Sequence, residues 1–239
     1  MVSSEYLLVI CIIGFYLFDS IMLLYGNEVI LTESGGKWNL LFPINNFFIL
    51  NKALFIPNPL TPYSPLLLLY WTSPENELDA VDSGALDNFI RALRPLKYMI
   101  GILFALMIFA VPIILIRYGA EKKFIILLLT VYINILLIIS YIGYYRSELN
   151  ISVRKYILII VESLICAPYA LNILRKLSLN YYPGGYPFNA LTSLFNSDIF
   201  QSLQASLLGH IDTKIVIEPD DDRRSKLQQI RQTICKLQQ

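Results

Sequence analysis

The sequence predicts an all-α integral membrane protein with four transmembrane helices, a long loop, an interfacial helix and a C-terminal helical tail. Four apolar runs, residues 6–25, 98–116, 124–145 and 156–174, each have roughly the 17 to 25 residues that a helix needs to cross a bilayer. Hydrophobic residues make up 56% of the chain and charged residues 15%, whereas soluble domains usually carry roughly 25% charged residues. The net charge of +1 provides no basic surface for nucleic acid.

The first run has no basic segment before it and no small-residue cleavage site after it. It is therefore interpreted as a retained membrane helix rather than a signal peptide. The membrane domain is expected to occupy residues 1–178.

Residues 26–96 are expected to lie at the membrane surface. The first part is rich in aromatic residues and proline, a composition typical of a loop against lipid headgroups. Residues 60–71 are too short to cross, and they either stay at the interface or dip in as a re-entrant segment. From residue 78 to 96 the apolar residues follow helical spacing, with acids early and bases late, which predicts an interfacial amphipathic helix that ends at Pro95.

Residues 179–239 are predicted to form a soluble tail. A short helix is expected over residues 194–208, a short strand over 213–218 and a final helix after Pro219. The final helix carries an apolar stripe that needs a partner surface. The stripe and two loop tryptophans are the predicted partner-binding residues: Leu227, Ile230, Ile234, Leu237, Trp38 and Trp71.

Two acids and one amide inside the predicted membrane helices are the candidate ion or proton site. Asp19 and Glu162 each stand six residues from a helix end, and four crossings would place them in the same leaflet. Three interpretations of the two acids are open. They share a proton or bind a cation, they pair with Arg146, Arg154 or Lys155, or they lie at the hydrated edge of the membrane without a role. Asn134 lies near the middle of the third run and either lines a path or holds helices together.

No catalytic motif and no metal-ligand spacing is present, so neither a metal nor a cofactor is expected. The leading hypothesis is a non-enzymatic subunit or accessory factor of a larger membrane complex, with the lipid bilayer and other subunits as partners. The alternatives are a small ion- or proton-coupled transporter or channel that uses Asp19 and Glu162, and a membrane enzyme acting on a lipid.

The basic residues between the runs balance, and they do not decide the orientation. An even number of crossings places both termini in one compartment. A charged tail without a disulfide pattern favours a bacterial inner membrane with both termini in the cytoplasm.

Overall fold

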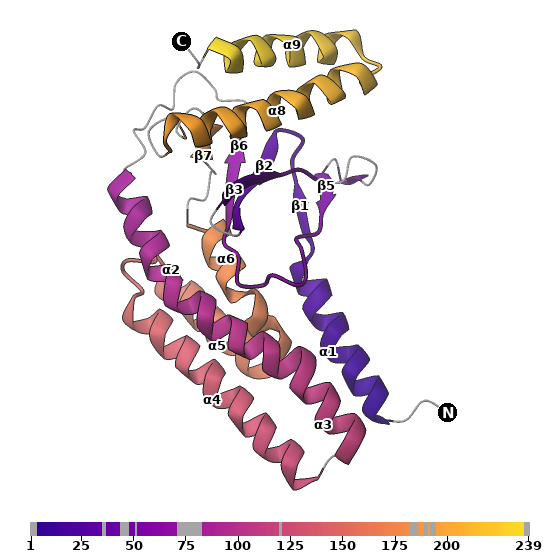
Figure 1. Ribbon diagram of the computed structural model, residues 1–239, viewed down its shortest axis with the longest axis vertical. Coiled ribbons are helices and arrows are strands. Elements are labelled where there is room, and N and C mark those ends of the chain that lie inside the picture. The colour runs from indigo at the N-terminus through magenta and orange to yellow at the C-terminus, as the bar shows by residue number, and fades with distance from the viewer. Residues whose placement is uncertain are drawn as a thin grey trace.

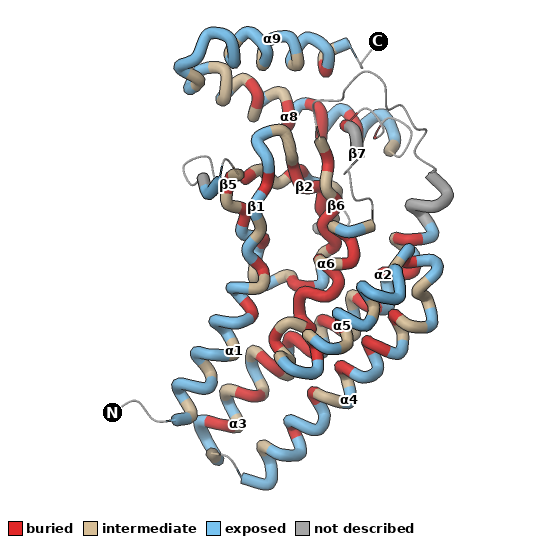
Figure 2. The backbone as a smooth tube through the Cα atoms, turned by 180° about the vertical axis from the view of Figure 1, so that it is seen from behind, coloured by how far each residue is buried: buried red, intermediate tan, exposed pale blue. Residues whose placement is uncertain are grey.

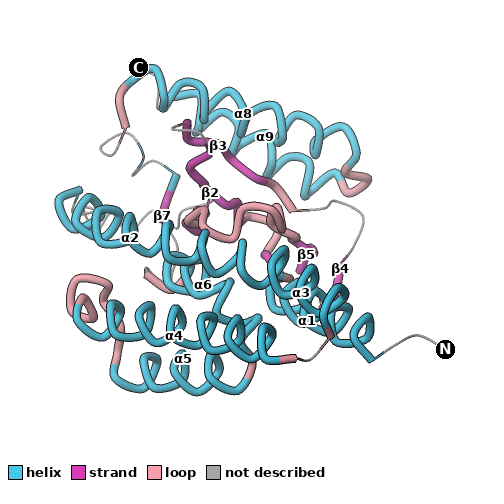
Figure 3. The backbone as a smooth tube through the Cα atoms, turned by 60° about the horizontal axis from the view of Figure 1, so that its bottom comes forward, coloured by secondary structure: helices cyan, strands magenta, loops and turns pink. Residues whose placement is uncertain are grey.

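The computed structural model shows three layers: a bundle of helices, a layer of β-strands and a pair of helices that covers the strands (Figures 1 and 3). It describes residues 4–34, 37–43, 48–50, 52–70, 83–119, 121–181, 186–188, 191 and 195–236. The described N-terminal end of the chain lies at the bottom of the bundle, and the C-terminal end lies beside the covering pair (Figure 1). The strands and the covering pair are called the head below.

The first apolar run is a helix for only part of its length. Helix α1 covers Ser4–Ser20, and strand β1 (Met22–Leu24) follows it almost at once. A continuous apolar run does not itself distinguish a helix from a buried strand. The prediction of a single transmembrane helix through residue 25 is therefore wrong.

Two small sheets occupy much of the region predicted as a loop. Strands β1, β4 (Phe48–Ile49) and β5 (Lys52–Phe55) form one sheet in the order β1-β5-β4. The other has the order β3-β2-β6-β7 and contains β2 (Glu28–Ser34), β3 (Lys37–Leu41), β6 (Leu66–Tyr70) and β7 (Tyr186–Pro187). Residues 66–70 are therefore neither a surface loop nor a re-entrant segment but an inner strand, with β2 antiparallel on one side and β7 parallel on the other.

Alternating residues of β2 are buried in two different cores. Ile30 packs with Leu24, Phe55 and Leu66, whereas Val29 and Leu31 belong to the main core with the helices. Successive side chains of a strand point to opposite faces, so β2 is covered on both sides. The all-α prediction is wrong because these β segments bury their apolar residues against one another and against the helices.

One long helix runs through the predicted interfacial helix and the second apolar run. It consists of α2 (Ser83–Phe104), a π-helical segment η1 (Ala105–Ala110) and α3 (Val111–Tyr118). Pro95 does not end this helix, so the prediction of a helix end there is wrong. Close to the proline, the Tyr141 hydroxyl donates a hydrogen bond of 2.9 Å to the carbonyl of Ala92, one turn before Pro95. The π-helical segment ends where Pro112, which has no N–H, enters the helix.

Helix α4 (Lys122–Tyr144) matches the third apolar run. The fourth run is broken instead: α5 (Val153–Ile165) ends before a 3-10 segment η2 (Ala167–Asn172), and α6 (Ile173–Leu179) leads back to the strands. Pro168 lies in the first turn of η2 and cannot continue the hydrogen bonding of α5. This run does not form one spanning helix.

The covering pair consists of α8 (Ser197–Ile217) and α9 (Asp221–Lys236), which lie side by side in Figures 1 and 3. The strand predicted over residues 213–218 is wrong, since α8 continues to Ile217. Within the pair, the Gln204 amide donates to the Ile234 carbonyl at 2.6 Å.

Two helices of the described residues are long and apolar enough to cross a membrane: the continuous helix over Asn88–Tyr118 and helix Lys122–Tyr144. The prediction of four transmembrane helices is wrong, because the first run ends its helix at Ser20 and the fourth is broken before Pro168.

Candidate functional site: a polar junction between bundle and head

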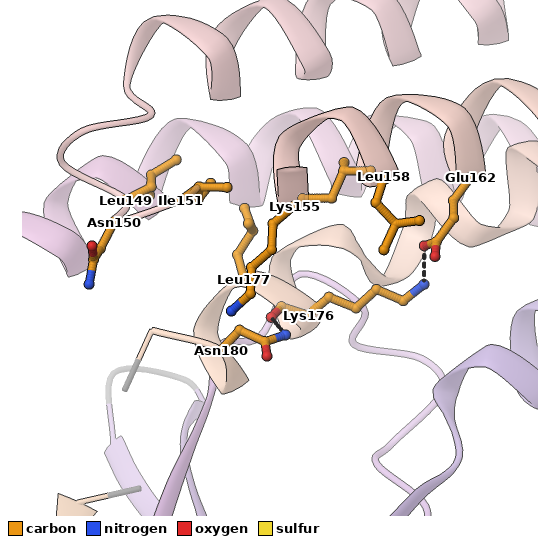
Figure 4. Close-up of a pocket in the computed structure, with 10 residues that line it drawn as sticks. Leu149, Asn150, Ile151, Lys155, Leu158, Glu162, Lys176, Leu177 and Asn180 are labelled. Carbon is orange, nitrogen blue, oxygen red and sulfur yellow. Dashed lines mark hydrogen bonds and ion pairs between the residues drawn. The ribbon is translucent and has the colours of Figure 1, made fainter. Parts of the chain in front are cut away.

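Asp19 and Glu162 meet at one lysine. The Lys176 ammonium lies 2.8 Å from Asp19 Oδ1 and 3.0 Å from Glu162 Oε2, and the link to Glu162 is drawn in Figure 4. The three groups come from the end of α1, the third turn of α5 and the first turn of α6. The two acids therefore lie close together, but neither pairs with Arg146, Arg154 or Lys155, the partners that the sequence suggested.

The sequence did not indicate that Lys176 binds the two acids. A basic pair directly after an apolar run is usually explained as side chains reaching for headgroups, but Lys176 instead turns to the acids and lies 5.2 Å from the centre of the Tyr169 ring. Burial alone would lower the pKa of Lys176, but the hydrogen bonds and charges of Asp19 and Glu162 outweigh it and raise the pKa. The ammonium stays charged, and the bridge is an ion-paired link.

Arg175 is 3% exposed and holds an irregular loop against the bundle. Its Nη2 donates to the carbonyls of Asn58 and Thr61 at 2.6 and 2.9 Å. Burial lowers the pKa of Arg175, and the neighbouring Tyr16 opposes that shift. Both carbonyls also accept from backbone N–H groups of the loop itself, Asn58 O from Thr61 N and Thr61 O from Ser64 N, at 3.2 Å each. A guanidinium presents five donors in a fixed fork, so Arg175 adds a second hydrogen bond to each of these two turn carbonyls and joins the loop to α6.

Asn172 connects Arg175 to α1. Its amide donates to Asp19 Oδ2 at 3.1 Å and to the Tyr16 carbonyl at 3.2 Å. Its Oδ1 accepts from Ser20 and from Arg175 at 3.1 and 3.3 Å. We call Asp19, Glu162, Asn172, Arg175 and Lys176 the polar junction.

The remaining contacts attach the junction to the head. The Tyr16 hydroxyl donates to the Pro59 carbonyl. The Ser178 hydroxyl accepts from the Leu66 N–H at 2.8 Å, at the start of β6. The loop between β5 and β6 and the first residue of β6 are thus bonded to α1 and α6.

The charges of the polar junction balance, with two acids and two bases. The ion pairs of Lys176 are partly screened by solvent, and breaking them is expected to cost roughly 1 to 2 kcal/mol. The arrangement is therefore suited to holding elements in place. Among the described residues, no group of three or more His, Cys, Asp or Glu side chains could hold a metal ion.

A cavity of about 250 Å³ lies beside the junction, between α5 and α6. Its wall is mostly apolar, and Lys155, Glu162 and Lys176 are its charged lining residues (Figure 4). A larger open groove on the other side of the α4–α5 turn shares Asn150 with it, and its lining includes Arg91, Tyr141 and Glu148.

The other predicted residues lie elsewhere. Asn134 is on α4 and its Oδ1 is buried without a hydrogen-bond partner. Trp38 is on β3 and packs on Phe195, with ring centres 5.1 Å apart. Trp71 and Leu237 lie outside the described residues.

The stripe on α9 is used within the chain. Ile234 is 3% exposed, and Leu227 and Ile230 pack against the main core. Their binding to another protein stays a prediction, and in this chain α8 supplies a surface for them.

Comparison with known protein families, with curated proteins and with solved structures finds no match for this chain. The function is therefore argued from geometry.

Proposed function

We propose that the bundle is embedded in a membrane. The apolar faces of α4 and of the long helix support this: in the most apolar 18 residues of each, only 33% are buried. The core helix of a soluble protein would be mostly covered. Figure 2 colours much of both helices as exposed. The large side chains that are exposed by half or more on the two helices are Tyr98, Ile102, Phe109, Ile113, Ile125, Ile126, Leu129, Ile133, Leu136 and Leu137.

Helices α1 and α5 accompany the two spanning helices without being long enough to count as spans. The first turn of α1 lies beside the end of α3, where Glu5 and Gly119 line the same small pocket. The start of α5 lies at the opposite end of the bundle, since Asn150 and Asn88 line one groove. The chain therefore starts at one end of the bundle and carries its head at the other.

The basic residues favour a cytoplasmic head. The α4–α5 turn and the middle of α2 lie at the same end of the bundle, since Arg91 and Glu148 line one groove. That end carries Arg91, Arg94, Lys97, Arg146, Arg154 and Lys155, whereas the far end carries Arg117, Lys122 and Lys123. Cytoplasmic ends are the more basic ones. In this proposal the C-terminal helices lie in the cytoplasm, as the sequence analysis expected for a bacterial inner membrane.

The chain acts, in this proposal, as a non-enzymatic subunit or accessory factor of a membrane complex. The observation that carries this is the polar junction, whose ionisable groups are bonded to one another and to the loop of the head. Such a junction fixes a head of strands and helices on a membrane bundle, which suits a part that positions other subunits. An enzyme or pump instead needs groups that are left available for substrate or ion.

Copurification tests the assembly role. The C-terminally tagged chain is expected to bring at least one further membrane protein in a constant ratio when it is extracted in mild detergent. Mass spectrometry identifies the partner, and crosslinking before extraction shows whether the contact exists in the membrane. A chain that purifies alone from crosslinked membranes contradicts the proposal.

A transporter or channel remains the second candidate, favoured by the meeting of Asp19 and Glu162 and by the buried, unpartnered Asn134 Oδ1. The amide variants Asp19→Asn and Glu162→Gln distinguish the two functions, because they keep shape and lose charge. Ion and proton flux is measured with purified chain in liposomes. Flux that either variant abolishes favours transport, whereas an absence of flux together with unchanged partner binding favours the subunit.

A further inference from the structure

The cavity between α5 and α6 has a basic end and an apolar wall. Lys155 lies in the first turn of α5, and among the described residues it makes no ion pair. Asn150, Ile151 and Asn180 lie at the same end, and the apolar wall consists of Leu149, Leu158, Ile159 and Leu177. Figure 4 shows Lys155 and Asn180 on facing helices, with Leu158 further along α5 toward Glu162.

The basic end is complementary to a phosphate group. The first N–H groups of a helix are unpaired and carry the positive end of its dipole; at α5 the Ser152 side chain accepts from Lys155 N at 3.3 Å, and Val153 and Arg154 precede it. Among the residues that line the cavity, the Lys155 ammonium and the side-chain amides of Asn150 and Asn180 are the groups at this end that can donate to an anion. The other two charged residues that line the cavity, Glu162 and Lys176, form an ion pair with each other.

The wall of the cavity is complementary to a hydrocarbon chain. Leu158 stands one turn beyond Lys155 on the same face of α5 and is 56% exposed, and Leu149 and Leu177 are buried behind it. The cavity volume is about 250 Å³, slightly below the range of roughly 300 to 1,000 Å³ that is usual for small-molecule pockets. This is room for part of a lipid, with its head at Lys155 and its chain along α5.

We propose that this cavity binds a phospholipid with a net negative headgroup, its phosphate at Lys155 and its acyl chain against Leu158 and Leu177. The inference rests on the proposed membrane location, because only there does α5 meet lipid. Basic pockets between membrane helices on the cytoplasmic side are known to take acidic headgroups. The basic end of this cavity lies at the head end of the bundle, which the distribution of Arg and Lys places in the cytoplasm.

The test compares phosphatidylglycerol with phosphatidylcholine. Purified full-length chain in detergent is mixed with each lipid, and bound lipid is counted by native mass spectrometry. The wild type is expected to hold one phosphatidylglycerol about tenfold more tightly than phosphatidylcholine, because both carry the phosphate but the choline group adds a positive charge close to Lys155. Lys155→Gln should remove this preference, and Lys155→Arg should retain most of it.

Two further variants separate charge and space. Lys122→Gln removes an exposed lysine at the far end of the bundle and should leave the preference unchanged. Leu158→Trp fills the groove without changing charge and should weaken both lipids. Equal binding of the two lipids by the wild type, or an unchanged preference in Lys155→Gln, overturns the proposal.

A competitor distinguishes a lipid from a small phosphate compound. Glycerol 3-phosphate and inorganic phosphate should not displace phosphatidylglycerol at equal concentration, since neither reaches the apolar wall. Displacement by either one overturns the lipid proposal in favour of a soluble phosphate ester. The membrane proposal fails separately, if the chain is found in the soluble fraction of cells.

Discussion

Helices α4 and α8 both bury an apolar stripe, but their outer faces differ. On α8 the stripe of Phe200, Leu203, Leu207 and Ile211 faces the core, and the outer face carries Gln201, Ser202 and Ser206. On α4 the buried stripe of Leu127, Val131, Ile135, Ile138 and Ile142 is accompanied by an outer face of Ile125, Leu129, Ile133 and Leu137. A helix that is apolar all round belongs in a core or in lipid. The outer face of α4 is exposed and apolar whereas that of α8 is exposed and polar, and this difference is what the proposed membrane location of the bundle accounts for.

The largest expected effect comes from a charge on each outer face. Leu129→Arg places a cation in the middle of α4, which costs about 2.5 to 3.5 kcal/mol on membrane-insertion scales. Ser206→Arg makes the matched change on α8, where water solvates the charge. We expect the first variant to lose carbonate-resistant membrane association and the second to keep it; equal behaviour would remove the distinction between the helices.

The next effect concerns the junction that joins the two regions. Lys176→Met leaves the carboxylates of Asp19 and Glu162 facing each other, and because solvent partly screens them we expect a loss of roughly 1 to 2 kcal/mol. Lys97→Met is the control, since it removes a single ion pair of 2.6 Å with Glu33 on β2 and should cost about 0.2 to 1 kcal/mol. Thermal unfolding in detergent measures both.

The same bridge gives a dependence on alkaline pH. The pKa of Lys176 is raised in the folded chain, so its contribution is complete below the ordinary value of 10.5 and is lost as pH rises through the higher folded value. Lys176→Met should lack that loss. A wild type and variant that lose stability in parallel above pH 10.5 would contradict the bridge.

A smaller effect is expected in the head. His210 stacks on Phe42 with ring centres 3.9 Å apart, and burial, followed by the charge of Lys214, lowers the pKa of His210 from 6.5 to about 4. As the pH falls, His210 is protonated at a higher pH in the unfolded chain than in the folded chain. The free energy of unfolding should therefore decrease as pH falls from 6.5 toward 4. We expect a loss of about 1 kcal/mol in the free energy of unfolding over this range. This is less than ~1.4 kcal/mol for each pH unit would give, because the ring is only partly buried.

His210→Phe keeps the stacking and removes the titration. The chain has one histidine, so unfolding temperatures between pH 7 and pH 5 report on this position before most carboxylates titrate. A wild type without a decline in that interval would show that the ring is open to solvent.

The smallest effect is expected at the exposed ion pair of the covering helices. Arg231 and Asp212 are 2.6 Å apart, but their side chains are 45% and 49% exposed. Water and salt screen such pairs. Arg231→Gln should leave the unfolding temperature unchanged within error, and a clear loss would mean that α9 depends on charge rather than on Ile234.

The sequence could predict the two helices that are long and apolar enough to cross a membrane, because each contains a long apolar run. The third run, 124–145, is nearly α4 itself. The strands could not be separated from loops by composition, although one signal was present: Gly35 and Gly36 separate two apolar segments, and Ser34 pairs with Lys37. Two glycines between strand-like segments are a hairpin signal.

The candidate site was predictable only on its acidic side. Asp19 and Glu162 are conspicuous because the residues around them are apolar. Asn172 lies near the end of the fourth apolar run and Arg175 and Lys176 follow it, so these residues resemble an ordinary helix end. Their roles depend on α6 turning back to the strands after Pro168, a tertiary arrangement that periodicity does not encode.

The loop held by Arg175 is made long before its partner. Asn58 and Thr61 precede Arg175 by 117 and 114 residues, and a ribosome adding about 5 to 20 residues per second needs roughly ten seconds to cover that distance. During this interval the loop can form its own turn hydrogen bonds, but Arg175 and β7 have not been synthesised. The edge of β6 that pairs with β7 in the finished fold is therefore unpaired for roughly this time, and an unpaired strand edge is a template for pairing with other strands.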